Sequence, residues 1–289
     1  MVVGLVGIPR ALGLCLLKQR IEDRGHHASF VNIREFPQYA LSGFDGSAFR
    51  FDHMDLLEFD CFYLDDLEGR NRFFRGIFGK DIWMELRERY IDFVESEGAN
   101  VAYQISLLMA LSSKRPFINS PRTFLQTRLR TSTLFSLAKA GLPTANIVVE
   151  EDRASDESAY LRIRFGEENT YDVPCFPRNF EGCVGLRACD SGDRLRIVVL
   201  RGERPSKVIL DDGQSIRAGE AGREIGQLAA DVLEVLGLET AEVSLVLSGN
   251  RFKIMEVLPT PDLAEFEDIT GEPISDRIAE RLLSMGGAP

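Results

Sequence analysis

The first third of the chain alternates short apolar runs with segments of helical period, and this alternation constrains the fold more than any other feature. Val2–Val6, Ala28–Ile33 and Phe59–Leu64 are apolar, β-rich runs of strand length. Between the first two, Arg10–Arg24 carries apolar residues at helical spacing, and Gly25 follows as a helix-ending residue. Strands that alternate with helices imply a parallel sheet. The sequence therefore predicts an N-terminal parallel α/β domain.

The rest of this first third is less regular. Trp83–Glu95 and Val101–Leu111 carry apolar residues at helical spacing and are predicted as helices. Gln38–Leu56 and Arg70–Lys80 have no clear period, so both are predicted as loops.

A boundary is expected near Lys114-Arg115-Pro116, which divides the chain into an N-terminal domain of residues 1–115 and a second domain of residues 116–289. The second domain opens with a short strand, and one helix over Thr123–Ala140 is predicted to follow it. The remaining clear signals are two hairpins and two helices. They cover Leu195–Leu200 with Lys207–Leu210, Ala221–Leu236 ended by Gly237, Glu242–Leu247 with Phe252–Val257, and Ser275–Leu283.

Composition excludes several classes of protein. The net charge of −11 argues against a nucleic-acid partner, because phosphate binding needs clustered Lys and Arg. No apolar run is long enough to cross a bilayer, and we expect neither a signal peptide nor a membrane partner. Five cysteines without a disulfide rhythm fit a cytoplasmic protein. The oligomeric state stays open, and a homo-oligomer is compatible with the sequence.

Other common sites lack their signatures. Gly4, Gly7 and Gly13 follow the first strand but do not form the GxGxxG pattern, so a turn that serves the fold is favoured over a dinucleotide or sugar-nucleotide site. The three histidines have no partner at metal-ligand spacing, and no GxSxG motif is present. Three cysteines in a Gly-rich region favour packing, with a zinc site as the alternative: Cys175, Cys183 and Cys189.

Several sequence blocks in the second domain occur in an order known from one family. They are Asn119-Ser120-Pro121-Arg122, a helix with Arg128 and Arg130, Gly141-Leu142-Pro143-Thr144, Ala241–Leu245, Ile254-Met255-Glu256-Val257-Leu258-Pro259-Thr260-Pro261, and Phe266–Ile274. This series resembles the ATP-grasp superfamily, and within it the ribosomal-protein glutamate ligase (RimK-like) branch. The resemblance implies an α/β chain in which a parallel pre-ATP-grasp domain precedes an ATP-grasp domain with a shortened central subdomain.

The resemblance also implies a chemistry. ATP-grasp ligases activate a carboxylate as an acyl phosphate and let an amine displace the phosphate, with ATP and Mg²⁺ as cofactors. Mg²⁺ prefers oxygen ligands, and Glu256 matches the central metal-binding Glu of the family pattern. The family's Asp on the preceding strand falls on Ser244. Because alternate residues of a strand share a face, Glu242 is the predicted second metal ligand. Leu258 stands where the family has a metal-binding Asn.

Basic residues are the predicted partners of phosphate. Arg128 stands at the family's helix Lys, and Arg178 falls near the second phosphate Lys, so both are predicted nucleotide ligands, with Arg187 as a third. Arg196 resembles the Arg of the family's "DxRvvv" strand, which reaches phosphate or substrate. Arg196 and Arg178 are therefore the predicted catalytic residues. A solvated sheet face is the alternative explanation of the arginines on this strand.

Two functions remain in competition. The first is an ATP-dependent carboxylate–amine ligase that adds glutamate or another amino acid to a cofactor or peptide. The second is a catalytically degenerate ATP-grasp protein with a binding or regulatory role, which Ser244 and Leu258 favour because neither supplies the ligand atom of the family pattern.

Overall fold

The structure is a computed structural model of the whole chain. It describes residues 1–9, 11–32, 42–44, 49–51, 53–65, 103, 105–128, 130–145, 147–152, 160–165, 169–174, 183–188, 193–248 and 251–287. The predicted helix Trp83–Glu95 and the predicted loop Arg70–Lys80 lie outside these ranges. Within them, every helix is too short or too polar to cross a membrane.

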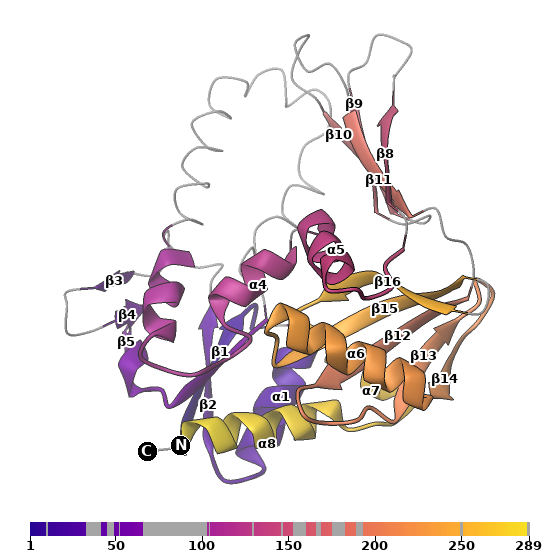
Figure 1. Ribbon diagram of the computed structural model, residues 1–289. Coiled ribbons are helices and arrows are strands. Elements are labelled where there is room, and N and C mark those ends of the chain that lie inside the picture. Colours follow the sequence, from indigo (N-terminus) through magenta and orange to yellow (C-terminus); the bar gives the residue numbers. More distant parts are fainter. Residues whose placement is uncertain are drawn as a thin grey trace.

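A parallel sheet forms the N-terminal part, as predicted. Its strand order is β2-β1-β6-β7, with β1 at Val2–Gly7, β2 at His27–Asn32, β6 at Cys61–Leu64 and β7 at Phe117–Ile118. All three pairings are parallel, and the crossover from β1 to β2 is helix α1 at Leu12–Glu22. Helices cover both faces of this sheet (Figure 1).

Each face of the parallel sheet has its own apolar core, because successive residues of a strand point to opposite faces. Leu5 and Tyr63 pack with α1 and with the C-terminal helix α8 at Ile274–Gly286. Val6 and Leu64 pack on the other side against the helical residues 105–112. That helix confirms the prediction over Val101–Leu111 in its described part.

The prediction of a loop over Gln38–Leu56 was wrong. This segment contains a small antiparallel sheet of β3 at Ser42–Phe44, β4 at Phe49–Phe51 and β5 at Met54–Asp55, followed by a 3₁₀ turn at Leu56–Glu58. The strands are two or three residues long, which is too short for an alternating pattern to be recognised in the sequence.

The predicted helix Thr123–Ala140 is two helices, α4 at Pro121–Arg128 and α5 at Arg130–Lys139. Threonine hydroxyls compete for main-chain carbonyls near the break. Thr133 Oγ1 donates to the carbonyl of Thr127 at 2.9 Å, and Thr127 Oγ1 donates to that of Thr123 at 2.8 Å. Residue 129, where the two segments meet, lies outside the described residues, and the bond from Thr133 to Thr127 spans it.

Four strands follow α5 and stand together at the top of Figure 1. β8 at Ile147–Asp152 pairs with β11 at Cys183–Ala188, and β9 at Tyr160–Phe165 pairs with β10 at Asn169–Pro174; both pairs are antiparallel.

A five-stranded antiparallel sheet lies in the C-terminal part of the chain. Its order is β14-β13-β12-β15-β16, with β12 at Arg194–Leu200, β13 at Lys207–Asp211, β14 at Ile216–Glu220, β15 at Thr240–Ser248 and β16 at Arg251–Leu258. Both predicted hairpins, β12–β13 and β15–β16, are confirmed. Helix α6 at Arg223–Leu236 packs on one face and ends at Gly237 with a φ of 70°, also as predicted.

The two parts of the chain share structure across the predicted boundary. The last strand of the parallel sheet, β7, begins one residue after Pro116. The C-terminal helix α8 packs against α1, where Arg24 pairs with Asp276 at 2.7 Å. Elements that follow residue 115 in the chain therefore pack with elements that precede it. The division at residue 115 stays a prediction.

Candidate functional site

The site lies on one face of the five-stranded sheet, where β12, β15 and β16 run side by side. Arg196 stands opposite Ser244, which stands opposite Glu256. One step along the strands, Val198 stands opposite Glu242, and Glu242 stands opposite Leu258. Directly opposed residues of antiparallel strands point to the same face. The register therefore gathers Arg196, Glu242 and Glu256, three of the predicted site residues, on a single face.

The other face of the same strands is apolar, which fixes this orientation. Ile197, Val243 and Val257 are buried against α5 and α6 in one core cluster. A slip of one residue would put these side chains in water and the charged ones in the core, so the register is strongly specified. The β15–β16 pairing has an irregularity between Ser244 and Leu245, where Ser244 pairs with Glu256 but Leu245 pairs with Ile254. This bulge keeps Ile254 in the core and Glu256 on the polar face.

Arg196 is the centre of the site and binds two carboxylates. Its Nη1 and Nη2 donate to Oε2 and Oε1 of Glu265 at 2.7 and 2.8 Å, a two-pronged ion pair. Its Nη1 also lies 3.4 Å from Oε1 of Glu242. Glu265 belongs to helix α7 at Leu263–Thr270, which packs beside this face of the sheet. The hydrogen bonds that Arg196 donates to Glu265 raise the pKa of Arg196, so this guanidinium stays charged.

The two carboxylates have different environments. The side chain of Glu242 is only 3% exposed, whereas that of Glu265 is 40% exposed. Burial raises the pKa of Glu242, although Arg196 and the Asp262 amide oppose this rise. The hydrogen bonds from Arg196 lower the pKa of Glu265. The result is one buried and one accessible carboxylate on the same guanidinium.

The N-terminus of α7 contributes to both carboxylates. Asp262 is the N-cap, and its Oδ1 accepts from the Glu265 amide at 3.1 Å. In a full capping box, the Glu at this third position would accept from the N-cap amide in return. Here the amide of Asp262 donates instead to Oε2 of Glu242 at 3.3 Å. The carboxylate of Glu265 is thereby left for Arg196.

The predicted metal ligands partly suit Mg²⁺. Glu242 and Glu256 are carboxylates on one face of the sheet. Glu256 stands opposite Ser244, a hydroxyl residue, and Glu242 lies two residues before Ser244 on β15. Mg²⁺ is commonly held by one or two carboxylates together with water and substrate phosphates, so this oxygen set fits it. Leu258 is 39% exposed beside them and supplies no ligand atom. Among the described residues, no three His, Cys, Asp or Glu side chains form a preformed metal cluster.

The predicted phosphate ligands lie elsewhere in the chain. Arg128 is the last residue of α4, and Arg187 lies on β11 opposite Val148 of β8; the structure describes their backbone and not their side chains. Arg178 falls outside the described residues. The roles of these three arginines remain predictions.

Asn119 holds the strands of the site together, a role that sequence reasoning did not assign. Its side chain is buried at the junction of β7 and α4 and makes four hydrogen bonds. Nδ2 donates to the carbonyls of Thr240 and Pro259 at 2.8 and 2.5 Å, and Oδ1 accepts from the amides of Glu239 and Thr240 at 2.8 and 3.2 Å. Asn119 therefore fixes the start of β15 to the end of β16, just beyond the Glu242–Leu258 pair. Its place before Ser120 and Pro121, a helix start, was the available signal.

Glu265 was also missed by sequence reasoning. The D-x-x-E spacing of Asp262 and Glu265 is the signal that marks a helix start. It does not tell which side chain Glu265 contacts.

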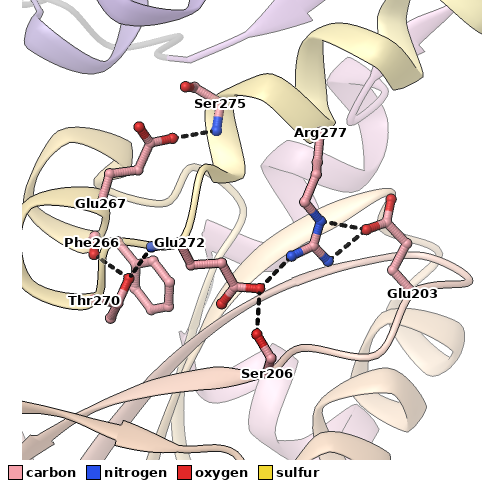
Figure 2. A network of polar contacts seen from close by, with 8 residues as sticks. All are labelled: Glu203, Ser206, Phe266, Glu267, Thr270, Glu272, Ser275 and Arg277. Atoms are coloured by element: carbon pink, nitrogen blue, oxygen red, sulfur yellow. Dashed lines mark hydrogen bonds and ion pairs between the residues drawn. The ribbon is translucent and has the colours of Figure 1, made fainter.

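A second polar network fixes the far end of α7 (Figure 2). Arg277 donates through Nε to Glu203 at 2.6 Å and pairs with the buried Glu272, which also accepts from Ser206 Oγ at 3.0 Å. Glu203 and Ser206 belong to the β12–β13 connection, and Glu272 and Arg277 to the turn and helix after α7. The network thus ties α7 to the sheet that carries Arg196.

No family model matches the chain. A probable alpha-L-glutamate ligase from Haemophilus influenzae is 23% identical over 271 residues, which cover 92% of this chain and 84% of that protein.

Solved structures resemble the whole chain. The ATP-grasp ligase PsnB, complexed with precursor peptide PsnA2 and AMPPNP, gives a TM-score of 0.73 at 15% identity and covers 98% of this chain and 97% of its own. The macrocyclase MdnC from Microcystis aeruginosa, bound with precursor peptide MdnA, gives a TM-score of 0.65 at 14% identity, with 98% of this chain and all of that one covered. These likenesses confirm the predicted ATP-grasp fold and the relation to glutamate ligases.

Proposed function

We propose that this chain, which has the ATP-grasp fold and is related in sequence to a probable alpha-L-glutamate ligase, is an ATP-dependent ligase that joins a carboxylate to an amine. In the reaction, a carboxylate oxygen attacks the γ-phosphorus of ATP, ADP leaves, and an acyl phosphate forms. The amine then attacks the acyl carbon, inorganic phosphate leaves, and the amine loses a proton.

The observation that carries the proposal is the placement of Arg196. Phosphoryl transfer depends on cations that neutralise the charge of the transferring group. Arg196 holds its guanidinium on the sheet face beside α7, where it is paired with Glu265, and its side chain is 26% exposed. Because the fork of an arginine matches two oxygens of a phosphate or carboxylate, Arg196 suits the γ-phosphoryl group or the acyl phosphate. Arg178 is proposed to act beside it.

The remaining roles follow the predicted residues. Arg128, Arg178 and Arg187 would bind the nucleotide phosphates, as cations near anionic oxygens. Glu242 and Glu256 would hold Mg²⁺, and the bound ion would supply positive charge to neutralise the phosphates. The strand register supports this assignment. Glu256 stands opposite Ser244, which stands opposite Arg196, and Glu242 lies two residues before Ser244 on the same face.

A peptide or cofactor is the proposed partner substrate, and glutamate or another amino acid the proposed amine. The name of the sequence relative points to glutamate, and two structural neighbours are complexed with precursor peptides.

The direct test measures ADP release from Mg·ATP with L-glutamate and a library of acidic peptides, and product mass by mass spectrometry. We expect ADP release that depends on both partners, with a mass gain that corresponds to one condensed amino acid. Arg196→Ala should lower the rate by about 10²-fold or more, as expected when a charge-stabilising donor is lost. A folded protein that neither turns over ATP with any acceptor nor binds Mg·AMPPNP would overturn the proposal.

Leu258 favours a second candidate function, a degenerate ATP-grasp protein that binds a ligand or partner and does no chemistry. It is opposite Glu242 and offers no metal-ligand atom. Thermal unfolding separates the two functions, because a ligand at about 100 times its Kd stabilises the folded state by about 2.7 kcal/mol. An intact site predicts stabilisation by Mg·ATP in the natural protein and none in Glu256→Ala. A natural protein whose thermal unfolding does not change with Mg·ATP would favour the degenerate alternative.

A further inference from the structure

We infer that Glu265 is a positioning residue for Arg196, and that its carboxylate is displaced when the anionic group of a substrate binds there. The inference rests on the proposed function, because it takes Arg196 to bind a phosphoryl or acyl-phosphate group. It adds a residue and an exchange of partners that the reaction itself does not require.

The geometry shows an occupied anion position. Both Nη atoms of Arg196 are bound by the two oxygens of Glu265 at 2.7 and 2.8 Å. This is the arrangement in which a guanidinium binds a carboxylate or two phosphate oxygens. A substrate anion that uses the same fork must therefore replace Glu265. Glu242 approaches the guanidinium less closely, at 3.4 Å, and from a buried position.

The two carboxylates differ in how easily they can leave. Glu242 is 3% exposed, lies on β15 between β12 and β16, and accepts a hydrogen bond from the amide of Asp262. Its removal from Arg196 would leave a charge buried in the protein, which is costly. Glu265 is 40% exposed and sits in the first turn of α7, where the helix dipole stabilises a negative charge and water can solvate it. Glu265 is therefore the exchangeable partner and Glu242 the fixed one.

The charge around Arg196 explains why an exchange of partners would help an anion to bind. Two carboxylates, Glu242 and Glu265, contact the Arg196 guanidinium, and a third, Glu256, lies on the same face two strands away. An anionic substrate would be repelled by this excess of negative charge. Release of Glu265 from Arg196 moves one negative charge away from the fork at the moment the substrate anion arrives. Until then, Glu265 keeps the guanidinium in the orientation that the anion needs.

The experiment compares the binding of Mg·AMPPNP by calorimetry in the natural protein, Glu265→Gln and Asp268→Asn. Asp268 is an exposed carboxylate on the same helix and serves as the matched control. Glutamine keeps the size of the side chain but removes the charge that competes for Arg196. We expect Glu265→Gln to bind about two- to fivefold more tightly, the range expected when a partly exposed ion pair no longer competes. Asp268→Asn should bind as the natural protein does.

Two further measurements make the result specific. In an Arg196→Ala background, the Glu265→Gln change should have no effect on binding, because the residues then share no interaction. Glu265→Asp, whose shorter side chain weakens the two-pronged contact, should show a smaller increase in affinity and guards against a Gln variant that fails to fold. If the natural protein binds Mg·AMPPNP while Glu265→Gln binds it equally or more weakly, the inference is wrong and the proposed function stands. If the natural protein does not bind Mg·AMPPNP, the proposed function itself fails, and the inference with it.

Discussion

Replacement of Asn119 by alanine should destabilise the protein strongly. The side chain is 1% exposed and satisfies four main-chain groups: the amides of Glu239 and Thr240 and the carbonyls of Thr240 and Pro259. A buried polar group that loses its partner costs about 1–3 kcal/mol. Glu239 is partly exposed, so water can replace its lost bond. The three remaining groups then give a loss of about 3–5 kcal/mol, near the upper end for single substitutions.

Urea unfolding followed by circular dichroism measures this loss. Gln227→Ala is the control, because Gln227 is an amide whose side chain bonds Asp231 in an exposed position on α6. The control should change the free energy of unfolding by about 0.5 kcal/mol or less. Asn119→Ala should also weaken Mg·AMPPNP binding, since the ends of β15 and β16 lose their common anchor beside Glu242. A loss of stability below about 1 kcal/mol would refute the view that Asn119 clamps the site.

Three further predictions concern the site and its support. Arg196→Lys should lower kcat/KM by about 10²-fold with little change in urea stability, since lysine keeps the charge but not the fork; an unchanged kcat/KM contradicts the role of Arg196. Tyr63→Phe should raise the free energy of unfolding by about 0.5–1 kcal/mol, because the buried Tyr63 hydroxyl has no hydrogen-bond partner among the described residues; a clear loss of stability speaks against this. Burial raises the pKa of Glu242 above the ordinary value of 4.5. The protonated side chain therefore contributes its full stabilisation to the folded state below that value, and this stabilisation is lost as pH rises through the raised pKa. The stability of Glu242→Gln relative to the natural protein should therefore increase from pH 4 to pH 8 in urea unfolding, and a relative stability that falls with pH would be inconsistent with the buried carboxylate.

Long elements with clear periodicity could be predicted from the sequence. The amphipathic helix α6 with Gly237 at its end and the β12–β13 and β15–β16 hairpins have clear patterns, and the parallel strands β1, β2 and β6 stand out as apolar, β-rich runs. The strands β3 to β5 have two or three residues each, so no period exists to be recognised. The division into α4 and α5 falls inside a continuous helical pattern of apolar residues, so that pattern does not report it.

The site was predictable only in part. The candidates Arg196, Glu242 and Glu256 came from the resemblance of their segments to one family, and the structure gathers them on one sheet face. Their mutual position depends on pairing between strands and on a bulge, neither of which can be read from residue order. Glu265 reaches Arg196 from a helix 69 residues further along the chain, so no local pattern connects them.

A crystal structure of the protein with Mg²⁺ and AMPPNP tests the central claim most directly. The proposed function predicts the γ-phosphate within hydrogen-bond distance of Arg196, and Mg²⁺ bound by Glu242 and Glu256 on the polar face of the five-stranded sheet. A nucleotide bound away from this face, with Arg196 still paired to Glu265 and no metal on Glu242 or Glu256, would contradict it.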